Sequence, residues 1–373
     1  MDGIPLDPFK QDVLTREQCE QYLERIDLPR SLLVEAQEGA GPSVELLSKL
    51  LLHHLEHVPK DTTPLHVVER EWHLATSSRI KLGRAFTNMP EGVSAFDRIV
   101  TQRKGAFCFA INATFSALLR AFGFRVSELV GRTFKSLGND PLTHPDGYKW
   151  GTLTHEVMLA DWPGSDARYL VDGAWGPWAA PVPIKLVDGE IVRGLNDYEA
   201  FQLVRELLPL SASSQTRPID ESTGWTFSRL VSPPGVSVSS SLPDSPPSSS
   251  PGDDDSTKTK TTTTTTGYWT PLFHFKLESV PLLDFRLYHH FSASHELASF
   301  TAFWLVTKLI PGTGGARRSM MYAEKEGGGT KAKVYTTGGH DAKGSLEGRD
   351  VEWVEMETHE MKAYLKKEFG FGF

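Results

Sequence analysis

The hydrophobic period changes once along this chain, near residue 125, and this change constrains the fold more than any other feature. Upstream, apolar residues recur at helical spacing over residues 16–26, 43–56, 94–103 and 107–124. Downstream they alternate with period two, first over 125–130 and then over 152–160 and 168–171, which form a predicted hairpin. Helical and strand patterns are thus separated along the chain. This predicts an α+β fold, with a helical N-terminal domain followed by a small antiparallel barrel or sandwich.

A segment of a different kind interrupts the strand patterns at residues 232–266. It holds Pro-Pro pairs, serine runs, three consecutive aspartates and a six-threonine tract. Such a composition cannot bury enough apolar surface to order itself, which predicts a disordered surface insertion. Strand chemistry returns at 268–275, followed by a hairpin over 319–324 and 332–337 and a last helix over 356–368. The predicted units are therefore 1–124, 125–231, 232–266 and 267–373.

Composition excludes several classes of protein. The net charge of −8 over 373 residues argues against nucleic-acid binding, which needs clustered lysine and arginine. Cys19 and Cys108 are the only two cysteines, so a disulfide scaffold is excluded and a reducing compartment is favoured. The N-terminus shows no secretory pattern, and no apolar run is long enough to cross a membrane. We expect a cytoplasmic protein, and the sequence indicates no particular oligomeric state.

Three histidines in the segment His53-His54-Leu55-Glu56-His57 invite a metal interpretation. The segment lacks the second histidine of the HExxH spacing, and no neighbouring cysteine or carboxylate set completes a site. We therefore interpret these histidines as the end of a helix and its exit loop, and predict no metal.

The stretch from Arg103 to Phe115 carries the strongest chemical indication. A basic pair and a glycine lead into Cys108, which opens an apolar helix. A cysteine at a helix N-terminus sits where backbone N–H groups favour a thiolate, although most free cysteines are buried hydrophobes. A nucleophilic cysteine needs a base and a group that orients the base.

Two downstream residues can supply these roles. His155 begins one strand of the predicted hairpin and Asp172 ends the other, so pairing places both at the same end of the sheet. The predicted triad is a Cys108 thiolate, a His155 base and an orienting Asp172, with Glu156 on the opposite face of its strand. Charge pairing with His155 should lower the pKa of Cys108 by several units, roughly from 8.5 toward 4–6.

These residues carry a resemblance to the arylamine N-acetyltransferase family, in its fungal-type members. The first matching motif contains Arg103 or Lys104, Gly105, Cys108, Phe109, Asn112 and Phe115. The others are Thr154, His155 and Leu159, and the run from Tyr169 to Gly176 followed by Pro181 and Pro183. The resemblance implies a helical domain, a β-barrel and a C-terminal α/β lid around a cysteine-protease-like core. It also implies ping-pong acyl transfer from an acyl-CoA co-substrate to arylamines or hydrazines, in xenobiotic detoxification, with no permanently bound cofactor.

The resemblance extends to binding residues. Thr154, Phe291, Leu297 and Ser299 match positions near coenzyme A, and Gly151 matches a loop near the substrate. Phe107 and Phe109 are candidates for the aromatic wall of the amine pocket, with a core role equally open.

The chain departs from the family pattern around the predicted pocket, at Ala106, Ala110, Gly173-Ala174-Trp175 and Pro59-Lys60-Asp61. Fungal-type members can prefer malonyl-CoA, so the donor stays open between acetyl-CoA and malonyl-CoA. Two alternatives also stay open. One is a transglutaminase-like thiol hydrolase with the same triad, and the other is an inactive homologue that only binds.

Overall fold

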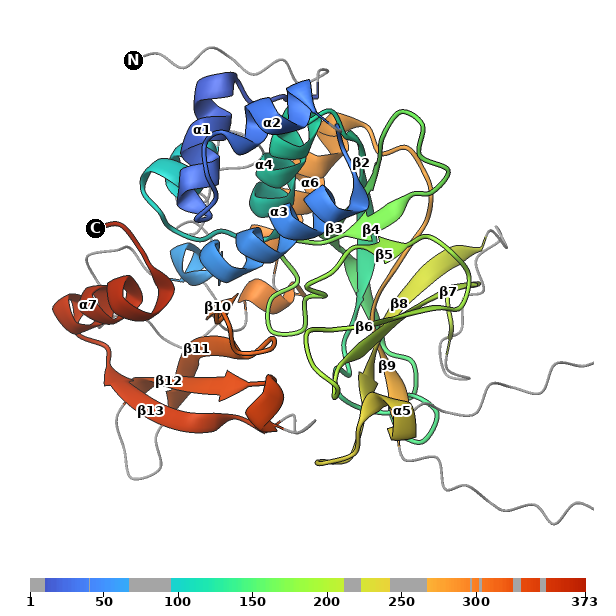
Figure 1. Cartoon of the computed structure of the whole chain (residues 1–373). Coiled ribbons are helices and arrows are strands. Elements are labelled where there is room, and N and C mark those ends of the chain that lie inside the picture. Colours follow the sequence, from blue (N-terminus) through green and yellow to red (C-terminus); the bar gives the residue numbers. More distant parts are fainter. Residues whose placement is uncertain are drawn as a thin grey trace, which may run out of the picture.

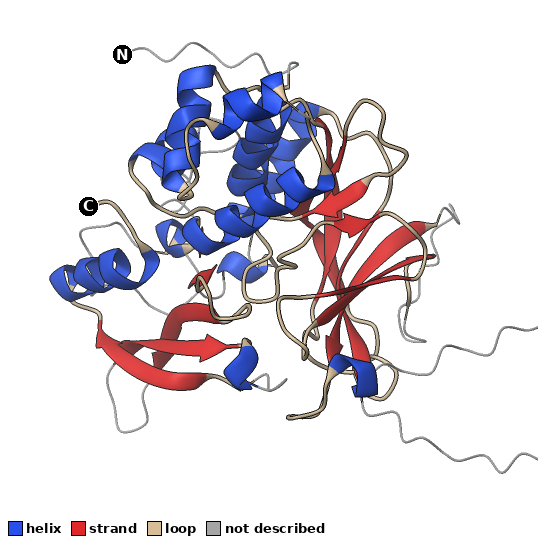
Figure 2. Ribbon diagram, in the orientation of Figure 1, coloured by secondary structure: helices blue, strands red, loops and turns tan. Residues whose placement is uncertain are grey.

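The computed structural model describes residues 11–39, 41–66, 95–210, 223–241, 267–295, 297–301, 304–324, 330–342 and 347–373. The described chain forms a group of helices, an eight-stranded sheet and a five-stranded sheet (Figure 1). Most of the helices gather at one end of the molecule with the two sheets beyond them, while α7 lies beside the C-terminal sheet and the short α5 at the far end of the barrel, as Figures 1 and 2 show. The predicted α+β class is confirmed.

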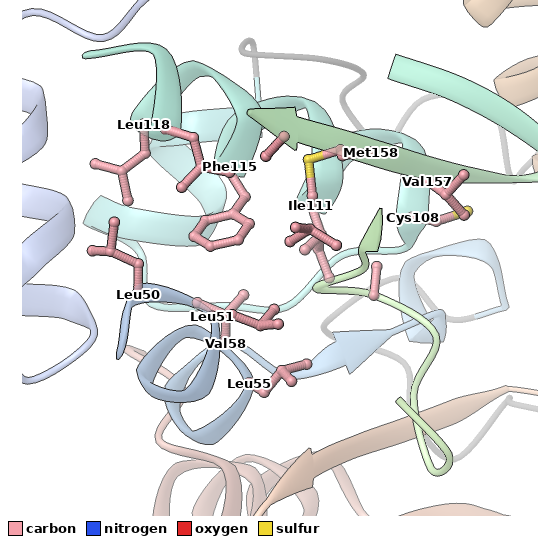
Figure 3. Close-up of a cluster of buried hydrophobic side chains, with 14 of the residues drawn as sticks. Leu50, Leu51, Leu55, Val58, Cys108, Ile111, Phe115, Leu118, Val157 and Met158 are labelled. Atoms are coloured by element: carbon pink, nitrogen blue, oxygen red, sulfur yellow. The ribbon is translucent and has the colours of Figure 1, made fainter. Parts of the chain in front are cut away.

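The N-terminal helices are α1 (Arg16–Arg25), α2 (Leu32–Glu38), α3 (Val44–His57) and α4 (Cys108–Ala121). A capping box between Thr15 and Gln18 starts α1. The leucines of α3 pack against Phe115 and Leu118 of α4, which itself lies on the sheet through Val157 and Met158 (Figure 3). The apolar stripes seen in the sequence thus build one continuous core.

One predicted helix differs in kind. The pattern over 94–103 contains a short π-helical turn, Asp97–Thr101, in its described part, while residue 94 lies outside the described residues. A single 3₁₀ turn, Thr63–Leu65, follows α3 and a two-residue strand, β1 (Lys60–Asp61).

The eight-stranded sheet has the order β5-β4-β3-β2-β9-β8-β7-β6, and all its described pairings are antiparallel. Its edge strands β5 and β6 contact one another, so the sheet nearly closes into a barrel. The strands are β2 (Arg125–Phe134), β3 (Trp150–Asp161), β4 (Tyr169–Val171), β5 (Ile184–Lys185), β6 (Glu190–Arg193), β7 (Ala200–Glu206), β8 (Gly224–Val231) and β9 (Tyr268–Phe275). The predicted hairpin is β3–β4, with Met158 opposite Val171.

The range predicted as a disordered insertion begins with ordered chain. Ser232 is buried, and a short helix α5 (Val238–Ser241) follows. Val238 packs with Ala200 and Leu230, so these first residues belong to the barrel's surface. Residues 242–266 lie outside the described residues.

The C-terminal part contains the second sheet, in the order β1-β10-β11-β12-β13. Its elements are β10 (Leu305–Leu309), β11 (Arg317–Glu324), β12 (Thr330–Thr337), β13 (Arg349–Glu355) and helix α7 (Thr358–Phe369). Helix α6 (Leu282–Ser294) and the 3₁₀ turns Ser299–Thr301 and His340–Ala342 complete it. Because β1 pairs with β10, the helical part supplies the edge strand of the C-terminal sheet. Within the described chain, no helix has the length and apolarity needed to cross a membrane.

Candidate active site

Cys108 is the first residue of α4, and its side chain is completely buried. The Sγ donates a hydrogen bond to Thr154 O of β3 at 3.6 Å. Gly105 is required just upstream, because a Cβ there would lie 2.3 Å from Pro59 O. The cysteine therefore lies at the predicted N-terminal end of a helix, between the segment that follows α3 and strand β3 of the barrel.

The β3–β4 hairpin brings His155 and Asp172 together, with His155 Nε2 2.6 Å from Asp172 Oδ2. Asp172 Oδ1 accepts hydrogen bonds from Asn112 Nδ2 at 3.1 Å and from Ala174 N at 2.9 Å. Burial by itself would raise the pKa of Asp172. The charge of His155 and these hydrogen bonds outweigh burial and hold the pKa below its usual value. The aspartate is thus an ionised, fixed partner for one imidazole nitrogen.

Asn112, one turn into helix α4, helps to position His155 and Asp172. Its Nδ2 donates to Glu156 O as well as to Asp172, and its Oδ1 accepts from Gly173 N at 3.0 Å. The motif contained Asn112, but the sequence alone assigned it no role. The Glu156 side chain lies near Glu128 and Arg120, in agreement with its predicted placement away from His155.

The thiol pKa differs from the sequence prediction. Burial raises the pKa of Cys108 to about 12, and the Lys60 ammonium opposes that rise. The predicted lowering was wrong for this geometry, because it weighed the helix terminus without the loss of solvent. The described contacts of Cys108 and His155 include no hydrogen bond between the two, so the sulfur is a neutral thiol held by Thr154.

A cavity of about 500 Å³ opens beside the triad, between the barrel and the C-terminal sheet. His155 and Thr154 lie in its wall, while Cys108 is one layer beneath, bonded to the Thr154 carbonyl. The lining is mostly apolar and aromatic, with a few polar groups, as is typical of small-molecule sites. It consists of Lys60, Thr133, Phe134, Lys135, Leu137, Thr154, His155, Trp175, Pro177, Trp178, Ala298, Ser299, Phe300, Leu305, Met321, Tyr335 and Thr337.

The predicted coenzyme A residues divide into two groups. Thr154 and Ser299 line the cavity, and Ser299 Oγ accepts a hydrogen bond from Lys135 Nζ at 2.8 Å. Phe291 stacks on His295, and Leu297 is 65% exposed, so neither belongs to the wall.

The predicted substrate residues lie elsewhere than expected. Phe107 stacks on His289 of α6 at 4.9 Å, and Phe109 packs against Phe285 of the same helix. Both are buried core residues outside the cavity wall, which corrects the aromatic-wall interpretation. Gly151 also lies outside the wall. Its missing side chain makes room for the Lys135 side chain, whose Cε would be 2.4 Å from a Cβ.

Lys60 is the functional candidate that sequence reasoning missed. It appeared there only as a departure from the family pattern. In the structure its side chain is 8% exposed, lines the cavity and donates from Nζ to Trp175 O at 2.8 Å. A charged residue directly after the Pro59 turn was the only indication in the sequence.

The histidines at the end of α3 serve separate purposes. His54 is buried and its Nδ1 lies 2.9 Å from the Tyr22 hydroxyl. Its ring occupies the space where a side chain at residue 173 would lie, which explains why Gly173 follows Asp172. His53, Glu56 and His57 gather their ligand atoms within 4.8 Å of one another, outside the cavity lining.

Comparison with known proteins identifies the family to which the chain is similar. A family profile described as N-acetyltransferase matches residues 89–370. An arylamine N-acetyltransferase of Mycolicibacterium smegmatis is 32% identical over 111 residues, which are 30% of this chain and 37% of that protein. An N-malonyltransferase of Fusarium pseudograminearum is 24% identical over 219 residues, 56% of this chain and 54% of that protein. The chain therefore spans only about a third to a half of these curated relatives.

Solved structures agree in fold over nearly the whole chain. The arylamine N-acetyltransferase from Salmonella typhimurium has a TM-score of 0.57 at 17% identity, covering 95% of this chain and 91% of that one. The arylamine N-acetyltransferase of Mycobacterium marinum in complex with CoA has a TM-score of 0.56 at 19% identity, covering 94% and 92%. Because the family profile also covers far more than half of its residues, the chain belongs to the N-acetyltransferase family.

Proposed function

We propose that this protein transfers a short acyl group, acetyl or malonyl, from coenzyme A to arylamines or hydrazines through an acyl-Cys108 intermediate. The observation that carries the proposal is the hydrogen bond between His155 Nε2 and Asp172 Oδ2 in the wall of a cavity that backs onto Cys108. The names of the relatives, arylamine N-acetyltransferases and an N-malonyltransferase, support this acceptor and these donors. A cytoplasmic enzyme that detoxifies foreign amines is the role that we propose for it.

The hydrogen bond to Asp172 sets the chemistry of His155. Because Nε2 donates its proton to the carboxylate, the form of His155 that acts as a base carries its lone pair on Nδ1. Because burial keeps Cys108 protonated at rest, catalysis requires Sγ to exchange its hydrogen bond with Thr154 O for one with His155. Nδ1 then takes the thiol proton while sulfur attacks the thioester carbonyl carbon of the acyl-CoA.

The two half-reactions balance through the same proton. When the tetrahedral intermediate collapses, the C–S bond to coenzyme A breaks, and the imidazolium returns its proton to the departing thiolate. An amine nitrogen then attacks the acyl-cysteine carbonyl, and His155 accepts the amine proton. The imidazolium finally protonates Cys108 Sγ as the amide is released.

Intact-protein mass spectrometry after mixing with acetyl-, propionyl- or malonyl-CoA tests the proposal. We expect a mass increase of one acyl group, lost in Cys108→Ala and retained in Cys19→Ala, because Cys19 packs in the core on α1. Adding an arylamine should remove the adduct and yield the amide. If no donor produces an adduct, the proposal fails, whereas an adduct that water removes as fast as the amine does would indicate a thiol hydrolase.

A further inference from the structure

Lys60 places an ammonium group inside the cavity, where an apolar acyl chain alone would not need one. Its Nζ donates to Trp175 O at 2.8 Å and lies 4.8 Å from the centre of the Phe300 ring. Burial lowers the pKa of Lys60, whereas the carbonyl, the aromatic faces and the charge of Asp172 favour its ammonium form. Burying a cation is costly unless an anion accompanies it.

The nearby carboxylates are already committed to other partners. Asp61, the next residue, forms an ion pair with Arg98 at 2.9 Å. Asp172 accepts from His155, Asn112 and Ala174. Among the described residues Lys60 forms no ion pair, and its hydrogen bond to Trp175 uses one of three N–H donors. The other two donors are available to a ligand in the cavity.

The backbone holds Lys60 close to the reacting sulfur. Residue 60 forms a parallel bridge to Ala106, two residues before Cys108, and Asp61 N donates to Ala106 O at 2.7 Å. The side chain then crosses Gly176, where a Cβ would lie 2.9 Å from Lys60 Cδ. The ammonium also acts electrostatically on the Cys108 thiol. The cation is therefore built into the same wall as His155, within electrostatic range of the sulfur that would carry the acyl group.

We propose that Lys60 binds the free carboxylate of a dicarboxylic acyl group, so that the cavity selects malonyl-type donors over neutral acyl donors. In a malonyl thioester one methylene separates the thioester carbonyl from the carboxylate, so an acyl group on Cys108 carries its anion a short way into the cavity. An acetyl group has no carboxylate that Lys60 could bind. This inference rests on the proposed acyl transfer and deepens it by naming the donor class.

The wild-type protein provides the first test, with malonyl-CoA compared against isovaleryl-CoA. The isovaleryl group has the branched shape of malonyl without its charge. We expect malonyl-CoA to acylate Cys108 roughly 10- to 100-fold faster, the effect of one hydrogen-bonded ion pair. Equal rates, or a preference for isovaleryl-CoA, would overturn the assignment without any variant. If neither donor nor acetyl-CoA produced an adduct, the acyl-transfer proposal itself would have failed.

The variant Lys60→Met separates donor binding from activation of the thiol. We expect Lys60→Met to slow acylation by acetyl-CoA and isovaleryl-CoA by one common factor, because the ammonium opposes the rise of the Cys108 pKa, and to slow acylation by malonyl-CoA by roughly a further 10- to 100-fold. Thermal unfolding of the variant shows separately that it folds. Lys60→Arg should keep part of the preference, since the charge remains in a different shape. If Lys60 served only to favour the thiolate, all donors would lose the same factor, and that result would contradict the proposal.

Lys135→Met is the matched control within the cavity. Lys135 also lines the wall and its Nζ donates to Ser299 Oγ at 2.8 Å, but it is only half-buried and is not among the charges that act on the Cys108 thiol. Its removal should change the rates with malonyl-CoA and isovaleryl-CoA by the same factor. A selective loss of malonyl transfer in Lys135→Met, with none in Lys60→Met, would place the carboxylate at the other lysine and refute the inference.

Discussion

Replacing Asp172 by asparagine tests the triad sharply, because the structure determines which way the new amide faces. Oδ1 accepts from Asn112 Nδ2 and Ala174 N, whereas Oδ2 accepts, among the described residues, only from His155 Nε2. An asparagine has one acceptor oxygen and one NH₂ group. With the oxygen in the Oδ1 place, both fixed donors stay satisfied. The reversed amide would strip two buried donors of their acceptor, at about 1–3 kcal/mol each, or about 2–6 kcal/mol together.

The favoured orientation turns the amide NH₂ toward His155 Nε2. The imidazole can accept that hydrogen bond only by moving its own proton to Nδ1. The nitrogen that should take the Cys108 proton is then already protonated. The same exchange in a Ser–His–Asp triad lowers kcat about 10⁴-fold, and we expect a comparable loss in the rate of Cys108 acylation, equivalent to about 5 kcal/mol.

Time-resolved mass spectrometry of the acyl adduct measures this rate directly, with thermal unfolding recorded for the same samples. Asp61→Asn is the control, because Asp61 is an equally buried carboxylate whose partner is Arg98. Asp61→Asn should lower the melting temperature, while its acylation rate should fall far less than that of Asp172→Asn. If Asp172→Asn lost less than about tenfold in acylation rate, the tautomer argument would be refuted.

Three further predictions concern stability. Gly173→Ala should lower the melting temperature by the equivalent of about 1–3 kcal/mol, because the Cβ meets the His54 ring at 2.8 Å, and an unchanged temperature would contradict this. Glu199→Gln should cost about 3–5 kcal/mol in urea titration, since it leaves Arg317 and Arg229 buried without the carboxylate now 2.9 and 3.6 Å away. Burial lowers the pKa of His54 to about 3, so as the pH falls the unfolded chain binds a proton there near pH 6.5, before the folded chain does. The free energy of unfolding should therefore fall by about 2 kcal/mol between pH 6.5 and pH 5. If His54→Gln showed the same dependence of stability on pH, this prediction would be refuted.

The pairing of His155 with Asp172 could be predicted from local pattern alone. Alternating apolar residues over 152–160 and 168–171 fix which face of each strand is buried, and a short turn fixes the register. Met158 lies opposite Val171 as a result, and that pairing carries His155 and Asp172 to the same end of the hairpin. Neighbours in sequence determine this part of the site.

The composition of the cavity wall could not be predicted in that way. Phe107 and Phe109 flank the cysteine, but helix α6, more than 170 residues later, covers both of them. Strand β9 returns from beyond the insertion to lie between β2 and β8, which no local period indicates. Which aromatic residues face solvent, core or ligand depends on such distant segments.

The thiol pKa was missed for a related physical reason. The sequence locates Cys108 at a helix N-terminus, where a thiolate is favoured. It does not show that the barrel and α6 exclude water from that terminus. Desolvation is the largest influence on the thiol, and it exceeds the opposing charge of Lys60.

Two of the departures from the family pattern, Lys60 and Trp175, meet at one wall of the cavity although they lie far apart in the sequence. Lys60 and Trp175 are 115 residues apart, yet the lysine donates to the tryptophan carbonyl and its backbone bridges to Ala106. The Trp175 ring packs edge-on against His155 at 4.6 Å. Because these residues touch one another, a change in one alters the space and charge available to the others. The triad geometry and these contacts in the wall support our proposal that this chain differs from its relatives in the acyl group it accepts rather than in the chemistry of the transfer.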